Sequence, residues 1–199
     1  MALIKKNKII IIANGESILQ NNYGDLIDEF PVVGRINNYQ IDGYQKYIGS
    51  KTSIWFNGAN QGLHKRKKFQ NEIIVLIPSS VQKKKGDINK IIKSRLGIQN
   101  NRYNQIAINK ISEYEKKCHL DRLTTGTLSI LWAIENYKEV YIYGFDFFID
   151  SKSHYFDNKL ISTMKNKGII PKANKHDMNK EKTYIDNLVE NGKLQILNA

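Results

Sequence analysis

The sequence feature that most constrains the fold is a short apolar run close to the start of the chain. Residues 9–13 are four isoleucines and an alanine, and the polar turn Asn14-Gly15 follows at once. A strand without alternating polar residues is typical of a sheet that is covered on both faces, as parallel sheets are. We therefore predict a buried strand over residues 8–13 in a mainly parallel sheet.

This run is too short for two other assignments. A membrane-spanning helix needs about 20 apolar residues. The apolar region of a signal peptide usually has about 7–15 residues and is followed by small residues, whereas Glu16 follows here. We therefore interpret the run as the first strand of the sheet.

Similar apolar segments recur along the chain and alternate with amphipathic ones. Further strands are predicted at 31–38, 51–56, 71–78, 138–148 and 193–197. Helices are predicted at 17–29, 41–48, 86–96, 124–137 and 175–192. This alternation predicts an α/β class protein, with a Rossmann-like three-layer fold in one domain of 199 residues. The poorly patterned stretch 157–175 is predicted to be a mobile lid.

Several predicted strands end in small polar residues. Asn14-Gly15, Asn37, Asn57 and Gly144 all follow apolar segments. Ligands of open α/β sheets bind beyond the carboxyl ends of the strands, so these residues predict a rim of neutral donors and acceptors around one ligand. The dinucleotide pattern G-x-G-x-x-G and the phosphate-binding loop are absent from the sequence. No Asp-x-Asp occurs, and we expect no metal and no cofactor.

Charge and cysteine content bear on the partners. Lys and Arg number 31 against 19 Asp and Glu, a formal net charge of +12. Such a surplus fits an anionic ligand, a nucleic acid or an acidic membrane surface, and it fits equally a lysine-rich solvated surface. The basic runs at 64–69 and 82–86 are interpreted as solvated loops.

Cys118 is the single cysteine, which favours a reducing compartment. We therefore expect a cytoplasmic protein, with the inner face of the membrane as an option.

Four segments, taken in order, resemble the motifs of the sialyltransferases, and they resemble the compact bacterial enzymes of that kind. Residues 9–57, with "YGDLID", "VVGRIN" and "GSKT", are similar to the large motif of that family. Residues 122–147, with "TTGT" and "EVYIYGF", are similar to its small motif. "HYFD" at 154–157 and "HDMNKE" at 176–181 are similar to its third and very short motifs.

The resemblance implies a reaction and three catalytic groups. The family transfers a sugar from CMP to an acceptor hydroxyl with inversion, through an oxocarbenium-like state. His176 is the predicted base, because a neutral imidazole accepts a proton at cellular pH and lies here beside a predicted helix start. Glu181 is predicted to orient that ring, and His154 is predicted to stabilise the departing phosphate. For His154 the alternative of an ordinary loop histidine is equally open.

The resemblance also implies residues that bind the donor. Amides near the strand ends are expected on the nucleotide, and Thr125 and Gly126, at a helix start, on the carboxylate of the sugar. Arg122 is expected to hold charge on the donor or the acceptor. The full predicted set is Asn14, Gly15, Asn37, Asn57, Arg122, Thr124, Thr125, Gly126, Gly144, Asp146, Phe147, Ser153 and Tyr155.

The leading hypothesis is a metal-independent glycosyltransferase that moves sialic acid, or a related acidic sugar such as Kdo, from its CMP donor to a glycan or glycolipid acceptor. One alternative is a catalytically inactive protein that binds CMP or another nucleotide. A basic nucleic-acid-binding protein is a further alternative, against which the core-like aromatics and the lack of a recognised motif both count. The sequence does not define the oligomeric state.

Overall fold

The computed structural model describes residues 6–66, 69, 71–84, 86–100, 102–146, 154–157 and 176–198. In this part of the chain seven parallel strands form one sheet in the order β5-β4-β3-β2-β1-β6-β7. The strands are β1 (Lys6–Ile12), β2 (Val32–Ile36), β3 (Ile54–Asn57), β4 (Glu72–Val75), β5 (Asn104–Gln105), β6 (Tyr137–Tyr143) and β7 (Gln195–Ile196). The predicted α/β class and parallel sheet are confirmed.

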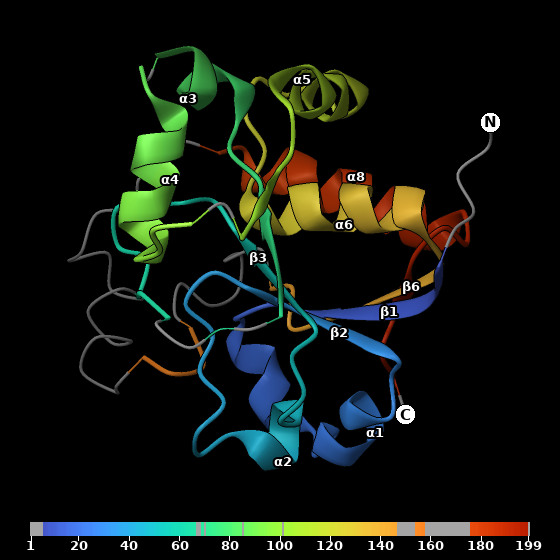
Figure 1. The fold of residues 1–199 in the computed structure, drawn as a ribbon. Helices are drawn as coiled ribbons and strands as arrows, with labels where there is room; N and C mark the ends of the chain where they lie inside the picture. The colour runs from blue at the N-terminus through green and yellow to red at the C-terminus, as the bar shows by residue number, and fades with distance from the viewer. Residues whose placement is uncertain are drawn as a thin grey trace.

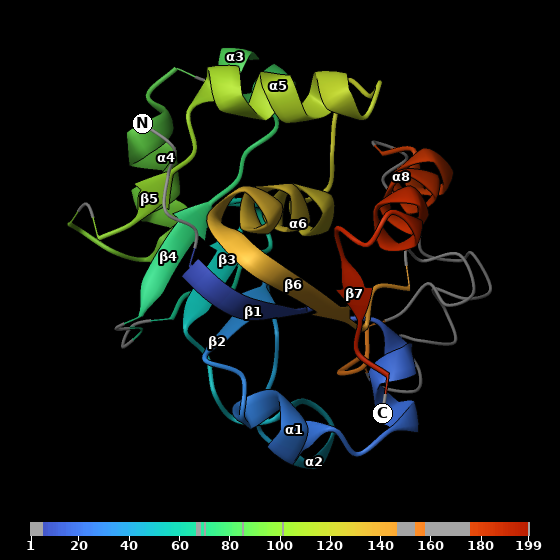
Figure 2. The ribbon, with the colours of Figure 1, turned by 90° about the vertical axis from the view of Figure 1, so that its right-hand side faces the viewer.

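Helices cover both faces of the sheet (Figures 1 and 2). They are the 3-10 helix η1 (Glu16–Gln20) and the α-helices α1 (Gly24–Asp28), α2 (Gln45–Ile48), α3 (Ser79–Lys84), α4 (Ile88–Leu96), α5 (Ile108–Lys117), α6 (Thr125–Asn136) and α8 (Met178–Glu190). In Figure 1, α5, α6 and α8 lie above the sheet, and α1 and α2 lie below it.

The first strand shows why its residues are apolar on both faces. Ile9 and Ile11 pack in a cluster with α6, whereas Ile10 and Ile12 pack in a second cluster with Ile27 of α1. All four side chains are at most 2% exposed. β1 pairs in parallel with β2 on one side and β6 on the other, so it is an interior strand of the sheet.

Several sequence predictions need correction. The helix predicted at 17–29 is two short helices, η1 and α1, because Asn21 is extended and interrupts the helical backbone. Gly24 at the start of α1 packs so close to α2 that a Cβ would lie 2.0 Å from the carbonyl oxygen of Gln45. Helix α5, helix α3 and strand β5 were not predicted, and part of the basic run 82–86 belongs to α3.

The other predicted elements are present, with shifted ends. The buried helix α6 has seven buried residues in succession, as its nearly uniform apolar sequence indicates. The predicted edge strand is β7, which pairs with β6. The predicted lid at 157–175 lies, apart from Asp157, outside the described residues.

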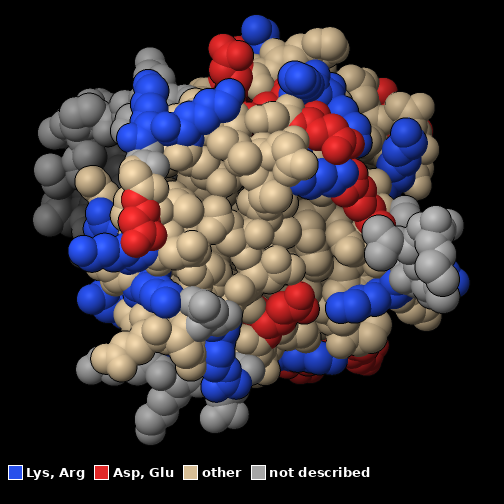
Figure 3. All heavy atoms as spheres, turned by 45° about the horizontal axis from the view of Figure 1, so that its top comes forward, with Lys and Arg blue, Asp and Glu red and all other residues tan. Residues whose placement is uncertain are grey.

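Within the described ranges no helix is long and apolar enough to cross a membrane. Figure 3 shows Lys and Arg side chains spread around one face of the molecule, with acidic side chains between them and an uncharged area at the centre. On this face the basic residues do not form one continuous stripe. This arrangement favours the interpretation of the surplus charge as a solvated surface.

Candidate active site

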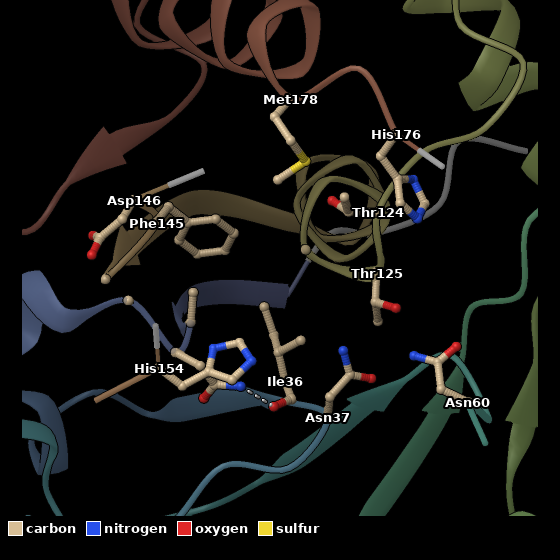
Figure 4. A pocket seen from close by; sticks show the side chains of 15 residues that line it. Ile36, Asn37, Asn60, Thr124, Thr125, Phe145, Asp146, His154, His176 and Met178 are labelled. Atoms are coloured by element: carbon tan, nitrogen blue, oxygen red, sulfur yellow. Dashed lines mark hydrogen bonds between the residues drawn. The ribbon is translucent and has the colours of Figure 1, made fainter. Parts of the chain in front are cut away.

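The chain order of the strands creates a crevice between β1 and β6. After β1 the chain moves to β2 and onward to β5, and it then returns to place β6 on the other side of β1. Loops therefore leave these neighbouring strands in opposite directions, which opens the sheet edge for a ligand. A cavity of about 300 Å³ lies here (Figure 4).

Most of the predicted site residues line this cavity, which we call the central cavity. Ten of them do so: Asn14, Gly15, Asn37, Thr124, Thr125, Gly126, Gly144, Asp146, His154 and His176. They come from the ends of β1, β2 and β6, from the start of α6 and from the segments around 154 and 176. The structure thus brings together residues that are up to 162 positions apart in the sequence, Asn14 and His176.

Asn14 is held so that one of its polar atoms remains available. Its Nδ2 donates to the carbonyl oxygen of Ile36 at 3.0 Å, which fixes the orientation of the amide (Figure 4). Its Oδ1 is buried and has no hydrogen-bond partner among the described residues. A buried acceptor without a partner is costly, so this atom indicates a donor group on a bound ligand.

Asn37 follows β2 with φ +48, the left-handed conformation that asparagine tolerates better than most residues. Its Oδ1 accepts a hydrogen bond from the backbone N–H of Gly58 at 3.2 Å. Its carbonyl oxygen accepts one from Nε1 of Trp55 at 2.9 Å. Asn37 therefore joins the end of β2 to the turn after β3.

The N-terminus of α6 opens onto the cavity. Thr124 is its N-cap, and its hydroxyl accepts from the backbone N–H of Thr127 at 3.2 Å. Thr125 and Gly126 follow in the first turn, where backbone N–H groups lack partners within the helix. The Thr125 hydroxyl also lies against the turn after β3, because a Cβ on Gly58 would be 2.8 Å from its Oγ1. A helix start of this kind favours an anion.

Glu181 of α8 connects this helix start to His176. The Glu181 side chain is fully buried, and it accepts hydrogen bonds from the Thr124 hydroxyl at 2.7 Å and from the Thr127 hydroxyl. Its two oxygens also share the backbone N–H of Thr124, each at 3.1 Å. Burial raises the pKa of Glu181 above its ordinary value, against the lowering effect of the hydrogen bonds from Thr127 and Thr124.

His176 lies just before α8, whose N-cap is Asp177. Its Nδ1 is 3.8 Å from Oε1 of Glu181 and 3.4 Å from the carbonyl oxygen of Arg122. Nδ1 thus faces two oxygen atoms of the protein, and a neutral imidazole that is oriented in this way can act as a base. Figure 4 shows His176 and His154 on opposite sides of the central cavity.

His154 is fixed to the end of β1 by the backbone. It forms an isolated antiparallel bridge with Gly15, and the backbone N–H of Tyr155 donates to the carbonyl oxygen of Asn14 at 3.2 Å. The backbone N–H of His154 donates to Oδ2 of Asp157 at 2.8 Å. These contacts hold His154 at the wall of the central cavity.

Asp146 lines the central cavity, and its carboxylate is held in place by Ser17. Its carboxylate accepts from the backbone N–H of Ser17 at 3.0 Å and from the Ser17 hydroxyl, so it caps η1. Gly15 lies directly against it, because a Cβ there would be 2.2 Å from Cγ of Asp146. Asp146 thus shapes the cavity by joining the ends of β1 and β6.

Besides Glu181, three predicted residues are not part of the wall of the central cavity. The side chain of Asn57 is fully buried, and its Oδ1 accepts from the backbone N–H of Ala59 at 3.2 Å. The Tyr155 hydroxyl accepts from the backbone N–H of Gln40 at 2.7 Å and donates to its carbonyl oxygen, and burial raises the pKa of Tyr155 to about 12. The Tyr155 hydroxyl is thus occupied by the protein, whereas Nδ2 of Asn57 is buried without a hydrogen-bond partner among the described residues. Arg122 lines a neighbouring cavity.

Two further predicted residues, Phe147 and Ser153, lie outside the described residues. Conversely, the cavity wall includes residues that the sequence did not single out: Ala13, Ile36, Asn60, Phe145 and Met178. Asn60 had a signal in the sequence, since it belongs to the same polar turn as Asn57. Within the described part of the chain, no group of three or more His, Cys, Asp or Glu side chains is placed to hold a metal ion.

Comparison with protein families decides the identity of this fold. The model of glycosyltransferase family 29 (sialyltransferase) matches residues 5–193, nearly the whole chain. The chain belongs to this family. The family resemblance of the four sequence segments is thereby confirmed.

Individual relatives match over short segments only. A β-1,6-galactosyltransferase of Arabidopsis thaliana is 40% identical over 50 residues, which are 25% of this chain and 13% of that protein. The human CMP-N-acetylneuraminate-beta-galactosamide-alpha-2,3-sialyltransferase 4 is 31% identical over 51 residues, 26% of this chain and 15% of that protein. The matched segments are thus a small part of these curated relatives.

Solved structures resemble the fold over most of its length. A mammalian sialyltransferase in complex with Gal-beta-1-3GalNAc-ortho-nitrophenol superposes with a TM-score of 0.70 and 18% identity, covering 96% of this chain and 69% of that one. The sialyltransferase CstII from Campylobacter jejuni, in complex with CMP-3FNeuAc, superposes with a TM-score of 0.64 and 20% identity. This match covers 96% of this chain and 82% of that one. At these identities the likeness shows the shared fold.

Proposed function

We propose that this family 29 member transfers a CMP-activated acidic sugar, with sialic acid as the first candidate and Kdo as the second, to a hydroxyl of a glycan or glycolipid. The observation that carries the proposal is the position of His176. It lines the same cavity as Asn14 and the N-terminus of α6, with the buried carboxylate of Glu181 beside its Nδ1.

The cavity offers complementary groups for each part of such a donor. The unpartnered Oδ1 of Asn14 accepts from the nucleotide, and Asn37 lies beside it. The hydroxyl of Thr125 and the free N–H groups at the start of α6 receive the carboxylate of the sugar. Neutral donors of this kind stabilise an anion without a metal ion.

In the proposed reaction His176 takes the proton of the acceptor hydroxyl. The acceptor oxygen forms a bond to the anomeric carbon from the face opposite the phosphate, so the configuration inverts. The bond between that carbon and the phosphate oxygen breaks, and its electron pair leaves with CMP. His154, on the other side of the cavity, donates a hydrogen bond or a proton to the departing phosphate.

Glu181 acts on this chemistry through its neighbours. Its hydrogen bonds to Thr124 hold the first turn of α6, and its proximity to His176 favours one orientation of the imidazole. It is a positioning residue, since Thr124, Thr127 and His176 surround it and its side chain is fully buried.

The Arabidopsis relative is named a galactosyltransferase, so the test must compare donors. The protein is incubated with CMP-Neu5Ac, CMP-Kdo or UDP-galactose, and released nucleotide and product are measured by mass spectrometry. We expect release of CMP from an acidic-sugar donor and none of UDP. Release of UDP alone would contradict the proposed donor class.

The variant His176→Gln tests the proposed base. Because general-base catalysis contributes about 10²–10⁴-fold, we expect kcat to fall by that factor while calorimetric affinity for CMP is retained. His64→Gln is the matched control, because His64 is exposed and lies outside the central cavity. Equal turnover of wild type and His176→Gln would show that His176 is not the base, whereas CMP binding without any donor turnover would support a silent nucleotide-binding protein instead.

A further inference from the structure

A second cavity adjoins the central one at the position of the proposed base. It has a volume of about 520 Å³ and lies between the turn after β3, the start of α3 and the segment before α6. We call it the α3 cavity. Asn60 and His176 line both cavities, so the imidazole is accessible from either side.

The wall of the α3 cavity contains cations without carboxylates. Arg122 and Lys84 line it, and none of its described lining residues is Asp or Glu. The Nε of Arg122 is buried and has no hydrogen-bond partner among the described residues. A buried guanidinium N–H without an acceptor indicates an anionic group on a ligand.

A third cavity near the central one provides a contrast. It has about 310 Å³ and shares Gly144, Phe145 and Asp146 with the central cavity, but His176 is not part of its wall. Its lysine, Lys182, is 2.6 Å from Asp186, so that positive charge is already neutralised. Neither its position nor its charge suits an acceptor that has to reach the base.

Part of the wall of the α3 cavity is apolar. Ile77, Pro78 and Val81 form it, at the end of β4 and in α3. An apolar wall beside polar groups suits a sugar ring, which has C–H faces and hydroxyl edges. The cavity thus combines an apolar wall that suits a sugar ring, two cations with no carboxylate among the described lining residues, and access to His176.

We propose that the α3 cavity is the acceptor site and that it binds a glycan whose terminal sugar carries an anionic group, a carboxylate or a phosphate. This inference rests on the proposed function, because it assigns the donor to the central cavity. His176 forms the wall between the two cavities, so a hydroxyl in the α3 cavity meets the base beside the bound donor. Arg122 and Lys84 bind the anionic group.

The test compares three acceptors with one donor. Lactose is neutral, 3′-sialyllactose carries a carboxylate, and 6′-phospholactose carries a phosphate. With the CMP-sugar that the wild-type protein turns over, we expect a KM for at least one acidic acceptor about tenfold lower than for lactose. The comparison of the two acidic acceptors identifies which anion is bound.

Variants on adjacent positions separate local from general charge effects. We expect Lys84→Gln to raise the KM for the preferred acidic acceptor about threefold, and Arg122→Gln to raise it about tenfold. In both variants the KM for lactose should rise by a smaller factor than the KM for the acidic acceptor. Lys83→Gln removes the same charge from the same helix, but Lys83 lines another cavity, so it should match wild type.

The two proposals fail in different ways. If wild-type protein releases CMP and uses all three acceptors equally, or if Lys83→Gln and Lys84→Gln behave alike, the acceptor assignment is overturned and the proposed function stands. If no donor is turned over, the proposed function fails. In that case saturation-transfer NMR measures the binding of 3′-sialyllactose, 6′-phospholactose and lactose. Binding of an acidic sugar in preference to lactose, with loss of that binding in Lys84→Gln, supports the acceptor site. Equal binding of all three sugars, or no binding, overturns the acceptor site.

Discussion

The contact between Gly15 and Asp146 allows a quantitative prediction for Gly15→Ala. Gly15 has φ −70 and ψ 153, which alanine adopts without strain, so the effect of the substitution is steric. The added Cβ would lie 2.2 Å from Cγ and 2.4 Å from both carboxylate oxygens of Asp146. Because such contacts do not occur, Asp146 has to move away by more than an ångström.

That movement breaks the two hydrogen bonds that Ser17 donates to the Asp146 carboxylate. A hydrogen bond to a charged group contributes about 1.5–3 kcal/mol, and the lower value applies because Asp146 is only partly buried. We therefore expect Gly15→Ala to reduce the free energy of unfolding by about 3 kcal/mol. Urea denaturation followed by circular dichroism measures this change, and Gly62→Ala, which meets no atom within 4 Å, is the control with an expected change within about 0.5 kcal/mol.

A double-mutant cycle identifies the cause. Asp146→Ala removes the same two hydrogen bonds and should also reduce the free energy of unfolding by about 3 kcal/mol. In Gly15→Ala/Asp146→Ala the clash is gone, so the double variant should lose about 3 kcal/mol and not about 6 kcal/mol. A loss equal to the sum, or a Gly15→Ala protein as stable as wild type, would refute the reasoning.

Two further predictions concern buried groups near the site. Tyr155→Phe leaves the backbone N–H and the carbonyl oxygen of Gln40 without their partner, so it should reduce the free energy of unfolding by about 1–3 kcal/mol. Urea denaturation measures this change, and an unchanged denaturation midpoint would contradict the two assigned hydrogen bonds. Because burial raises the pKa of Glu181, its contribution to stability is full below the ordinary glutamate pKa and is lost as pH rises through the folded value. The stability of wild type relative to Glu181→Gln should therefore fall as the pH rises above the ordinary pKa of glutamate. A stability difference that is constant or rises with pH would show that the hydrogen bonds from Thr124 and Thr127 outweigh burial.

The fold could be predicted largely from short-range patterns. The uniform apolar run at 9–13 indicated a strand buried on both faces, and β1 is indeed the strand between β2 and β6. The amphipathic helix α5, by contrast, was missed, because its apolar face consists mainly of Ile111 and Tyr114 in a charged segment. The break between η1 and α1, where Asn21 is extended and Gly24 packs against α2, was also missed.

The sequence alone determined which residues end the strands and which family motifs are present, because strand periodicity and turn residues are local properties. It placed Asn14, Asn37 and the start of α6 at a common edge, since parallel strands all end on one side of a sheet. Only the tertiary structure decided what each side chain contacts. Asp146 and Tyr155 are occupied by Ser17 and Gln40, and His176 lies between two cavities, because these contacts depend on the packing of segments that are distant in the sequence.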